Sequence, residues 1–184
     1  MVSTPTAITI ERLTAAHVDA TFQAATESVE DTFPWMEWCH PQLTPVELAA
    51  FMAALDQAWD NGGAFTFAVL DSATGEFLGV AGLNRIHKGE RFGNLHYWVR
   101  SGRTGRGIAT RAAKLVCHFG IMELGLQRIG ILVPEGNVAS EHVAEKLGAI
   151  REGVLRNASR LHDRQMNGTQ YSIIPSDMNG ISAA

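Results

Sequence analysis

Residues 103–113, RTGRGIATRAA, decide the fold predicted for this chain. Three glycines, Gly102, Gly105 and Gly107, lie in or beside this stretch. The preceding run LHYWVR is typical of a strand, and the following run, rich in Ala, Lys and Leu, is typical of a helix. Glycine permits a positive φ or a close approach to the backbone. The order strand, glycine turn and helix start therefore predicts an anion site, usually for phosphate, on the unpaired amides of the helix.

Two common phosphate motifs fit this turn poorly. A Walker A loop needs Lys and Ser or Thr after its last glycine, where this chain has Ile108 and Ala109. A dinucleotide fingerprint needs a third glycine, where this chain has Thr110, and an acidic residue after the next strand, which here runs into Pro134. From the turn alone, the alternative that this is a tight strand-to-helix connection that binds no ligand remains open.

Composition indicates a soluble globular chain. The 184 residues include 46% hydrophobic and 18% charged residues, which predicts one domain over 1–184, with a core at about 7–175 and a frayed C-terminal tail. The net charge of −4 excludes a broad attraction to nucleic acid or to an anionic membrane. With no signal peptide, membrane span, CxxC or HExxH pattern, we expect a cytoplasmic protein with two reduced cysteines and no metal.

Hydrophobic periodicity along the chain predicts an α+β fold. Helices are expected at about 14–29, 45–61 and 107–124, with a short one within 137–149 that Gly148 closes, and the second helix starts with a capping box of Thr44 and Glu47. A helix joins the strand at 93–100, before the glycine turn, to the strand at 127–133. These two strands should therefore be parallel neighbours. The sheet is therefore mixed and mostly antiparallel, with one parallel β-α-β step and about seven strands, at residues 7–13, 64–71, 76–86, 93–100, 127–133, 149–156 and 169–175.

The stretches YWVRSGRTGRGIATRAAKLVCHFG and GNVASEHVAEKLGAIREGVLR closely resemble the GNAT-type N-acetyltransferase superfamily, in particular its RimJ/RimL-type branch. The resemblance runs from Ile8 to Pro175 and is strongest from Tyr97 to Arg156. It implies a GNAT-like fold and acetyl-CoA as co-substrate. Thr104 departs from the family motif, which has Gln or Arg at that position. The resemblance places the pyrophosphate on the backbone amides of Thr104, Gly105, Arg106, Gly107, Ile108 and Ala109.

Three further positions receive roles from the resemblance. It implies that the backbone amide of Val99 stabilises the oxyanion and that Asn137 contacts the cofactor. It also implies that Ser140 lies near the thiolate sulfur. A tyrosine that many relatives carry four residues later is replaced here by Ala144, which leaves Ser140 as the candidate acid. The alternative for Asn137 and Ser140 is that they only cap the helix that follows; the cofactor role is favoured for Asn137, and the two alternatives are balanced for Ser140.

The general base and the acceptor site are less defined. Asn94 stands where the family often has a glutamate and is not a base. His96, two residues on, is the candidate because its reference pKa suits the task, although a single histidine on a strand is more often structural. Glu152 matches a common family residue whose pattern is structural as often as catalytic. Trp35, Trp38 and Glu37 are candidate acceptor-binding residues, since acids attract an ammonium group and tryptophans offer a cation–π wall. A solvated acidic segment beside core tryptophans is the alternative.

The predicted function is acetyl transfer to a primary amine by direct attack through a tetrahedral intermediate. The acceptor is a protein N-terminus or a small amine, and a homodimer is compatible with the sequence. The alternative is a non-catalytic acyl-CoA-binding sensor or scaffold of the same fold, favoured by Asn94 and Ala144.

Overall fold

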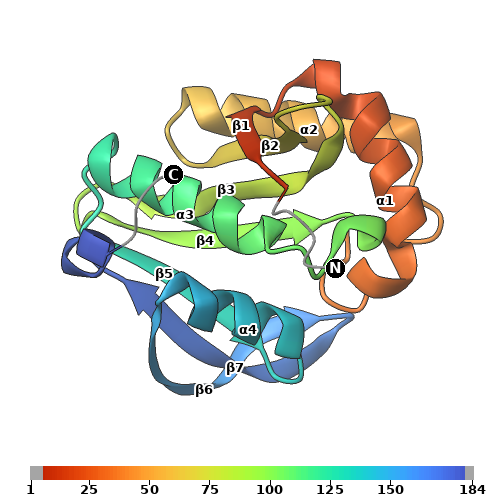
Figure 1. Ribbon diagram of the computed structural model, residues 1–184. Coiled ribbons are helices and arrows are strands. Elements are labelled where there is room, and N and C mark those ends of the chain that lie inside the picture. Colours follow the sequence, from red (N-terminus) through yellow and green to blue (C-terminus); the bar gives the residue numbers. More distant parts are fainter. Residues whose placement is uncertain (1–5, 181–184) are drawn as a thin grey trace, which may run out of the picture.

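The computed structural model describes residues 6–180 and is built on one seven-stranded sheet (Figure 1). The strand order is β1-β2-β3-β4-β5-β7-β6. Only β4 and β5 are paired in parallel, and every other neighbouring pair is antiparallel. The predicted mixed sheet with a single parallel step is confirmed. The strands are β1 (Ile8–Arg12), β2 (Phe65–Asp71), β3 (Phe77–His87), β4 (Phe92–Val99), β5 (Arg128–Pro134), β6 (Ile150–Leu161) and β7 (Arg164–Ile173).

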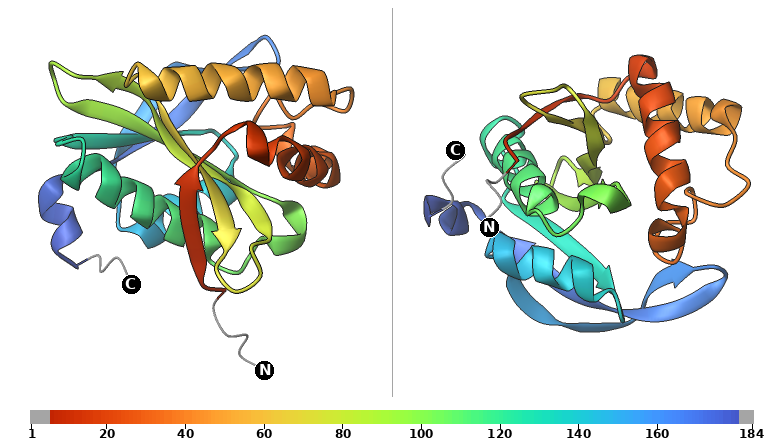
Figure 2. Two further views of the ribbon diagram at one scale, coloured as in Figure 1. Left: turned by 90° about the horizontal axis from the view of Figure 1, so that it is seen from above. Right: turned by 45° about the vertical axis from the view of Figure 1, so that its right-hand side comes forward.

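Helices cover both faces of the sheet. Figure 2 shows α2 on one side of the sheet and α3 on the other. The helices are α1 (Val18–Thr32), α2 (Pro45–Asp60), α3 (Ile108–Met122) and α4 (Val138–Leu147). The predicted capping box at α2 is present, since the Thr44 hydroxyl accepts from the Glu47 amide at 3.2 Å and the Glu47 carboxylate accepts from the Thr44 amide at 2.9 Å. Within residues 6–180, no helix is long and apolar enough to cross a membrane.

The side chains of β4 divide between two cores because successive residues of a strand face opposite sides. Trp98 packs into the core that α1 and α2 cover. Leu95 is buried in the core that α3 covers, and Tyr97 and Val99 pack against the same core. The end of β4 therefore presents Tyr97 and Val99 on the side of α3 and α4.

The parallel pairing of β4 with β5 is short. It comprises three residue pairs, from Phe92 with Arg128 to Asn94 with Gly130. Beyond Asn94 the two strands separate (Figure 1), while β5 continues to pair with β7 as far as Pro134. The second half of β4 thus has a sheet neighbour on one side only, and the gap lies directly before the glycine turn.

Several element boundaries differ from those predicted. The last two strands extend to a two-residue turn at His162 and Asp163, which have φ values of +50° and +60°. Such a turn usually contains Gly or Asn, so its residues did not mark it. The first predicted helix begins as a 3-10 turn at Ala15–His17, and α1 extends to Thr32. The tail predicted to fray forms a 3-10 helix at Pro175–Gly180, and its last four residues lie outside the described residues.

Candidate active site

A cavity of about 410 Å³ lies where β4 and β5 have separated. Four segments line it: the end of α1 with the loop after it, the end of β4, the glycine turn with the start of α3, and the start of α4. The lining residues include Asp31, Trp35, Tyr97, Val99, Thr104, Gly105, Gly107, Ile108, Ala109, Asn137 and Ser140. The predicted cofactor-binding residues are thus gathered around one space, except that Arg106 is exposed beside it.

The glycine turn has the backbone shape that the sequence predicted. Gly105 and Gly107 have φ values of +73° and +72°, and Gly107 is the residue that precedes the first turn of α3. In the described part of the chain, six successive amides have no backbone or side-chain acceptor: those of Gly105, Arg106, Gly107, Ile108, Ala109 and Thr110. Free amides at the positive end of a 15-residue helix form an anion site, and these residues fit a pyrophosphate.

Three arginine side chains near the turn form ion pairs or hydrogen bonds within the protein. The Arg103 guanidinium pairs with Glu76 at 2.6 Å, and Arg100 pairs with Glu27 and Glu76. Arg111 donates to the Arg106 carbonyl oxygen at 2.8 Å and so braces the turn from within α3. Because Arg103 is held by Glu76, it does not replace the arginine that the family motif has at the position of Thr104.

The backbone amide of Val99 points away from β3. The next amide, that of Arg100, donates to the Leu78 carbonyl oxygen of β3 at 2.9 Å. Because successive amides of a strand point to opposite edges, the Val99 amide faces the side where β5 has separated. Val99 also lines the cavity. An amide in this position can donate to an oxygen inside the cavity.

Two hydroxyls meet across the cavity wall. The Tyr97 Oη of β4 lies 2.9 Å from the Ser140 Oγ of α4 and 3.1 Å from the Ser140 carbonyl oxygen. Asn137 caps α4, since its Oδ1 accepts from the Ser140 amide at 3.1 Å. The cap therefore uses the side chain of Asn137 and leaves the Ser140 hydroxyl for the cavity. Sequence reasoning missed Tyr97, although the alternation of β4 places it on the same face as Val99.

The model for the Acetyltransferase (GNAT) domain matches residues 7–150 of this chain. The chain belongs to the GNAT acetyltransferase family. The predicted family is confirmed, and the seven-stranded sheet with its parallel step is the GNAT fold.

The curated relatives of this GNAT chain are named for different acceptors. This chain is 32% identical to the ribosomal-protein-serine acetyltransferase of Escherichia coli (strain K12) over 99 residues. The aligned segment covers 54% of this chain and 55% of that protein. The chain is 33% identical over 97 residues to the spermidine N(1)-acetyltransferase of the same strain, covering 53% and 49%. The matched part spans about half the length of these curated relatives. The Mycobacterium smegmatis RimJ structure in complex with CoA-disulfide has a TM-score of 0.87 at 20% identity, covering 95% of this chain and 86% of that one.

The candidate base residues of this GNAT chain lie outside the cavity lining. His96 is not among the lining residues, and burial lowers its pKa to about 4, which makes it a weak base at neutral pH. Asn94 donates to the Asn84 side chain at 3.3 Å. Glu152 receives two hydrogen bonds from Arg128 at 2.5 Å each, and this pairing lowers its pKa to about 2. Glu152 is therefore a structural partner of β5, and the structure gives His96 no contact with the cavity.

The three residues predicted to bind the acceptor lie in different parts of the structure. Trp35 lines the cavity and lies 3.7 Å from the position that a Cβ would take at Gly136, before α4. Trp38 instead stacks on Phe51 of α2, with 5.9 Å between ring centroids, and packs against the core under α1 and α2.

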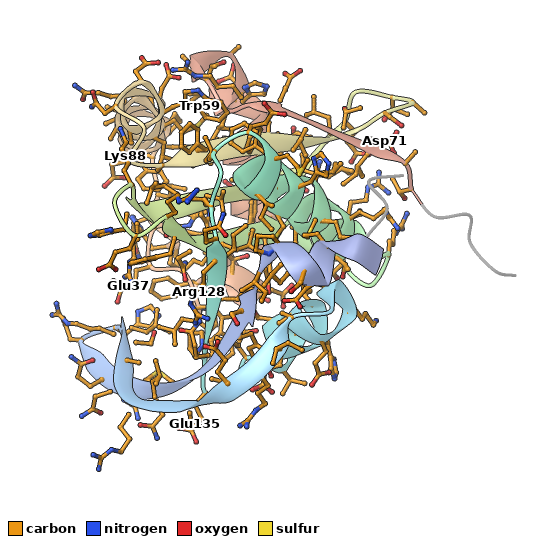
Figure 3. The ribbon with its side chains drawn as sticks, turned by 90° about the vertical axis from the view of Figure 1, so that its left-hand side faces the viewer. Glu37, Trp59, Asp71, Lys88, Arg128 and Glu135 are labelled. Carbon is orange, nitrogen blue, oxygen red and sulfur yellow. The ribbon has the colours of Figure 1, made fainter. Side chains whose placement is uncertain are left out.

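Glu37 serves a contact between distant parts of the chain. Its carboxylate accepts from the backbone amide of His162 at the tip of the β6–β7 hairpin. Figure 3 shows Glu37 on the side of the molecule near this hairpin. The His162 ring packs edge-on against Phe33 at 4.4 Å between centroids, and its Nε2 lies 2.9 Å from the Phe33 carbonyl oxygen. The hairpin tip thus braces the loop that carries Trp35 into the cavity wall.

Both cysteines are buried and unsuited to act as nucleophiles. Burial raises the pKa of Cys39 to about 11 and that of Cys117 to about 12. A thiol becomes nucleophilic as its thiolate, and these thiols stay protonated at neutral pH. This supports direct transfer of the acetyl group over an acetyl-cysteine intermediate.

Replacing Thr104 with alanine is expected to change acetyl-CoA affinity by no more than about one neutral hydrogen bond, 0.5–1.5 kcal/mol. The reason is that the Thr104 hydroxyl donates to the Ser101 carbonyl oxygen at 3.0 Å, within its own turn. Isothermal calorimetry with acetyl-CoA measures this change. Thr104→Arg, which restores a common family residue, should bind as tightly or more tightly. A larger loss in Thr104→Ala would show that the side chain itself holds the cofactor.

Proposed function

We propose that this protein is an acetyl-CoA-dependent N-acetyltransferase that acts on a primary amine by direct attack. The observation that carries the proposal is the convergence on one cavity of the free amides of the glycine turn, the Val99 amide and the Ser140 hydroxyl. The first group suits a pyrophosphate, the second an oxyanion and the third a departing sulfur.

The groups of the cavity divide the reaction between them. The amine nitrogen forms a bond to the thioester carbon, and the carbonyl electrons move to oxygen, where the Val99 amide stabilises the charge. A preorganised donor of this kind contributes about 10²–10³ in rate. The C–S bond then breaks and its electron pair remains on sulfur, where the Ser140 hydroxyl donates a hydrogen bond. The amine loses one proton, and CoA finally carries one on its sulfur.

A protein N-terminal α-amino group is the favoured acceptor class. Its reference pKa is about 7.7–8.0, against about 10.4 for a lysine-type amine, so a useful fraction is neutral without a strong base. The described cavity lining holds few bases, with Asp31 on the acceptor side and His142 on α4. The curated relatives are named for a ribosomal protein and for spermidine, and both acceptor classes enter the test.

Coenzyme A and acetyl-CoA are expected to stabilise the fold against heat, whereas NAD and ATP at equal concentration stabilise it far less. A ligand at one hundred times its dissociation constant adds about 2.7 kcal/mol to the free energy of unfolding. Thermal denaturation with each ligand measures the difference. Equal shifts from all four compounds, or none from CoA, would contradict the proposed cofactor.

Mass spectrometry of acceptors after incubation with acetyl-CoA tests catalysis itself. The acceptors are a peptide with a free N-terminus, the same peptide with a blocked N-terminus, and spermidine. A mass increase of one acetyl group on the free peptide alone supports the favoured acceptor. Stabilisation by CoA without acetylation of any amine, in a lysate or in this panel, would favour the binding-only alternative.

A further inference from the structure

Tyr97 lines the cavity and makes a contact that has no role in the proposed function. It comes from β4, whereas its partner Ser140 comes from α4. Their oxygens lie 2.9 Å apart, and the Tyr97 hydroxyl also reaches the Ser140 carbonyl oxygen at 3.1 Å. The other tyrosine of the chain, Tyr171, is buried in the core and does not line the cavity.

The two hydroxyls have one proton each, and the Tyr97 proton has two acceptors within reach, the Ser140 Oγ at 2.9 Å and the Ser140 carbonyl oxygen at 3.1 Å. If the Ser140 proton points to Tyr97, the serine offers only lone pairs to the cavity. If the Tyr97 proton points to Ser140 Oγ, the serine proton is free to face a ligand. Burial raises the pKa of Tyr97 to about 12, so tyrosine keeps its proton at neutral pH and remains a donor.

The Ser140 backbone offers no hydrogen-bond donor to the cavity. Its amide is used by the Asn137 cap at 3.1 Å, and its carbonyl oxygen is an acceptor. The hydroxyl proton is therefore the one donor that Ser140 has left for a sulfur atom. Ala144, one helical turn further along α4, is fully buried and carries no polar group.

We propose that Tyr97 is a positioning residue that directs the Ser140 hydroxyl proton at the departing sulfur of CoA. The inference rests on the proposed function and deepens it. When the C–S bond breaks, its electron pair stays on sulfur and the serine hydroxyl donates a hydrogen bond to it. Tyr97 donates to Ser140 in turn, so a phenol on β4 supports the leaving group in place of one on α4.

The pKa of the CoA thiol in its complex with the protein tests the inference without an acceptor amine. Thiolate absorbance in the ultraviolet is titrated for free CoA and for CoA bound to the wild type, Tyr97→Phe, Ser140→Ala and the double variant. The wild type should hold the bound thiol below its ordinary value of about 8.5. Tyr97→Phe should raise it by about 0.5–1, the effect of one hydrogen bond, and the double variant should match Ser140→Ala alone.

Tyr171→Phe is the matched control, because it removes the same hydroxyl from a tyrosine outside the cavity. It should leave the thiol pKa at the wild-type value. In turnover assays Tyr97→Phe should lower kcat about 2- to 10-fold with little change in KM for acetyl-CoA.

Three outcomes would overturn the inference. One is an unchanged thiol pKa in Tyr97→Phe, and another is additive effects of the two substitutions. A wild-type protein that does not bind CoA would overturn the proposed function and this inference with it. Normal CoA titrations with no acetylated amine would overturn only the catalytic assignment, since the hydroxyl pair would still be shown to act on bound sulfur.

Discussion

Replacing Ser140 with alanine is expected to lower kcat by roughly 10²–10⁴, the range of a positioned proton donor. The Ser140 hydroxyl lines the cavity, 2.9 Å from the Tyr97 hydroxyl, and we expect its proton to face the departing sulfur. This interaction strengthens as negative charge develops on sulfur, so KM for acetyl-CoA should change much less than kcat. Steady-state kinetics with a fixed amine acceptor measures both constants.

The stability of Ser140→Ala separates catalysis from helix capping. The cap of α4 depends on Asn137 Oδ1 and the Ser140 amide, and alanine retains that amide. The free energy of unfolding should therefore stay close to the wild-type value. Thr44→Ala is the matched control, because it removes a cap from α2 and should cost about 1 kcal/mol of stability while turnover is retained. An unchanged kcat in Ser140→Ala would remove Ser140 from the mechanism.

Replacing Gly105 with valine is expected to weaken acetyl-CoA binding at least roughly 10- to 100-fold, equivalent to one charge-assisted hydrogen bond of about 1.5–3 kcal/mol. Gly105 has a φ of +73°, and no atom lies within 4 Å of the position of its missing Cβ. The added side chain would therefore project where the free amides of the turn receive a pyrophosphate. Calorimetry with acetyl-CoA measures the loss of affinity.

The chain offers a close control for this substitution. Gly75 has the same φ of +73° and the same open surroundings, but it lies in the turn between β2 and β3, away from the cavity. Gly75→Val reports the cost of backbone strain alone, about 1–3 kcal/mol. It should lose stability and retain acetyl-CoA affinity. Gly107→Val is less clean, because its Cβ would also meet Arg111 at 3.2 Å. Equal affinities in the Gly105 and Gly75 variants would refute the phosphate site.

The order of the strands and helices was predictable because it depends on local patterns. Alternating residues marked the strands, and glycines marked the turns at Gly105, Gly107 and Gly148, all of which have positive φ. The resemblance then selected candidate cofactor-binding residues between Val99 and Ser140, and all of them except Arg106 line the cavity. The β6–β7 turn escaped prediction because His162 and Asp163 adopt positive φ without being glycine, which only tertiary packing permits.

The acceptor side was predicted less well because its contacts join distant residues. Periodicity places Tyr97 on one face of β4, but it contains nothing about the distance to Ser140 on a later helix. The loop after α1 has no regular period, so the sequence placed Trp35, Trp38 and Glu37 together, and packing sends them to a cavity, a core and a hairpin. His96 shows the same limit, since burial decides its pKa.

The brace between Glu37 and His162 has a consequence for the order in which the protein folds. These residues are 125 positions apart, and closing so large a loop costs chain entropy before the contact is rewarded. The glycine turn, by contrast, lies between β4 and α3, which are neighbours in the chain and in space. We therefore expect the glycine turn to form early, from local contacts. The loop that carries Trp35 is braced only when the last hairpin docks, so a nascent chain should form the proposed CoA site before the proposed acceptor side of the cavity.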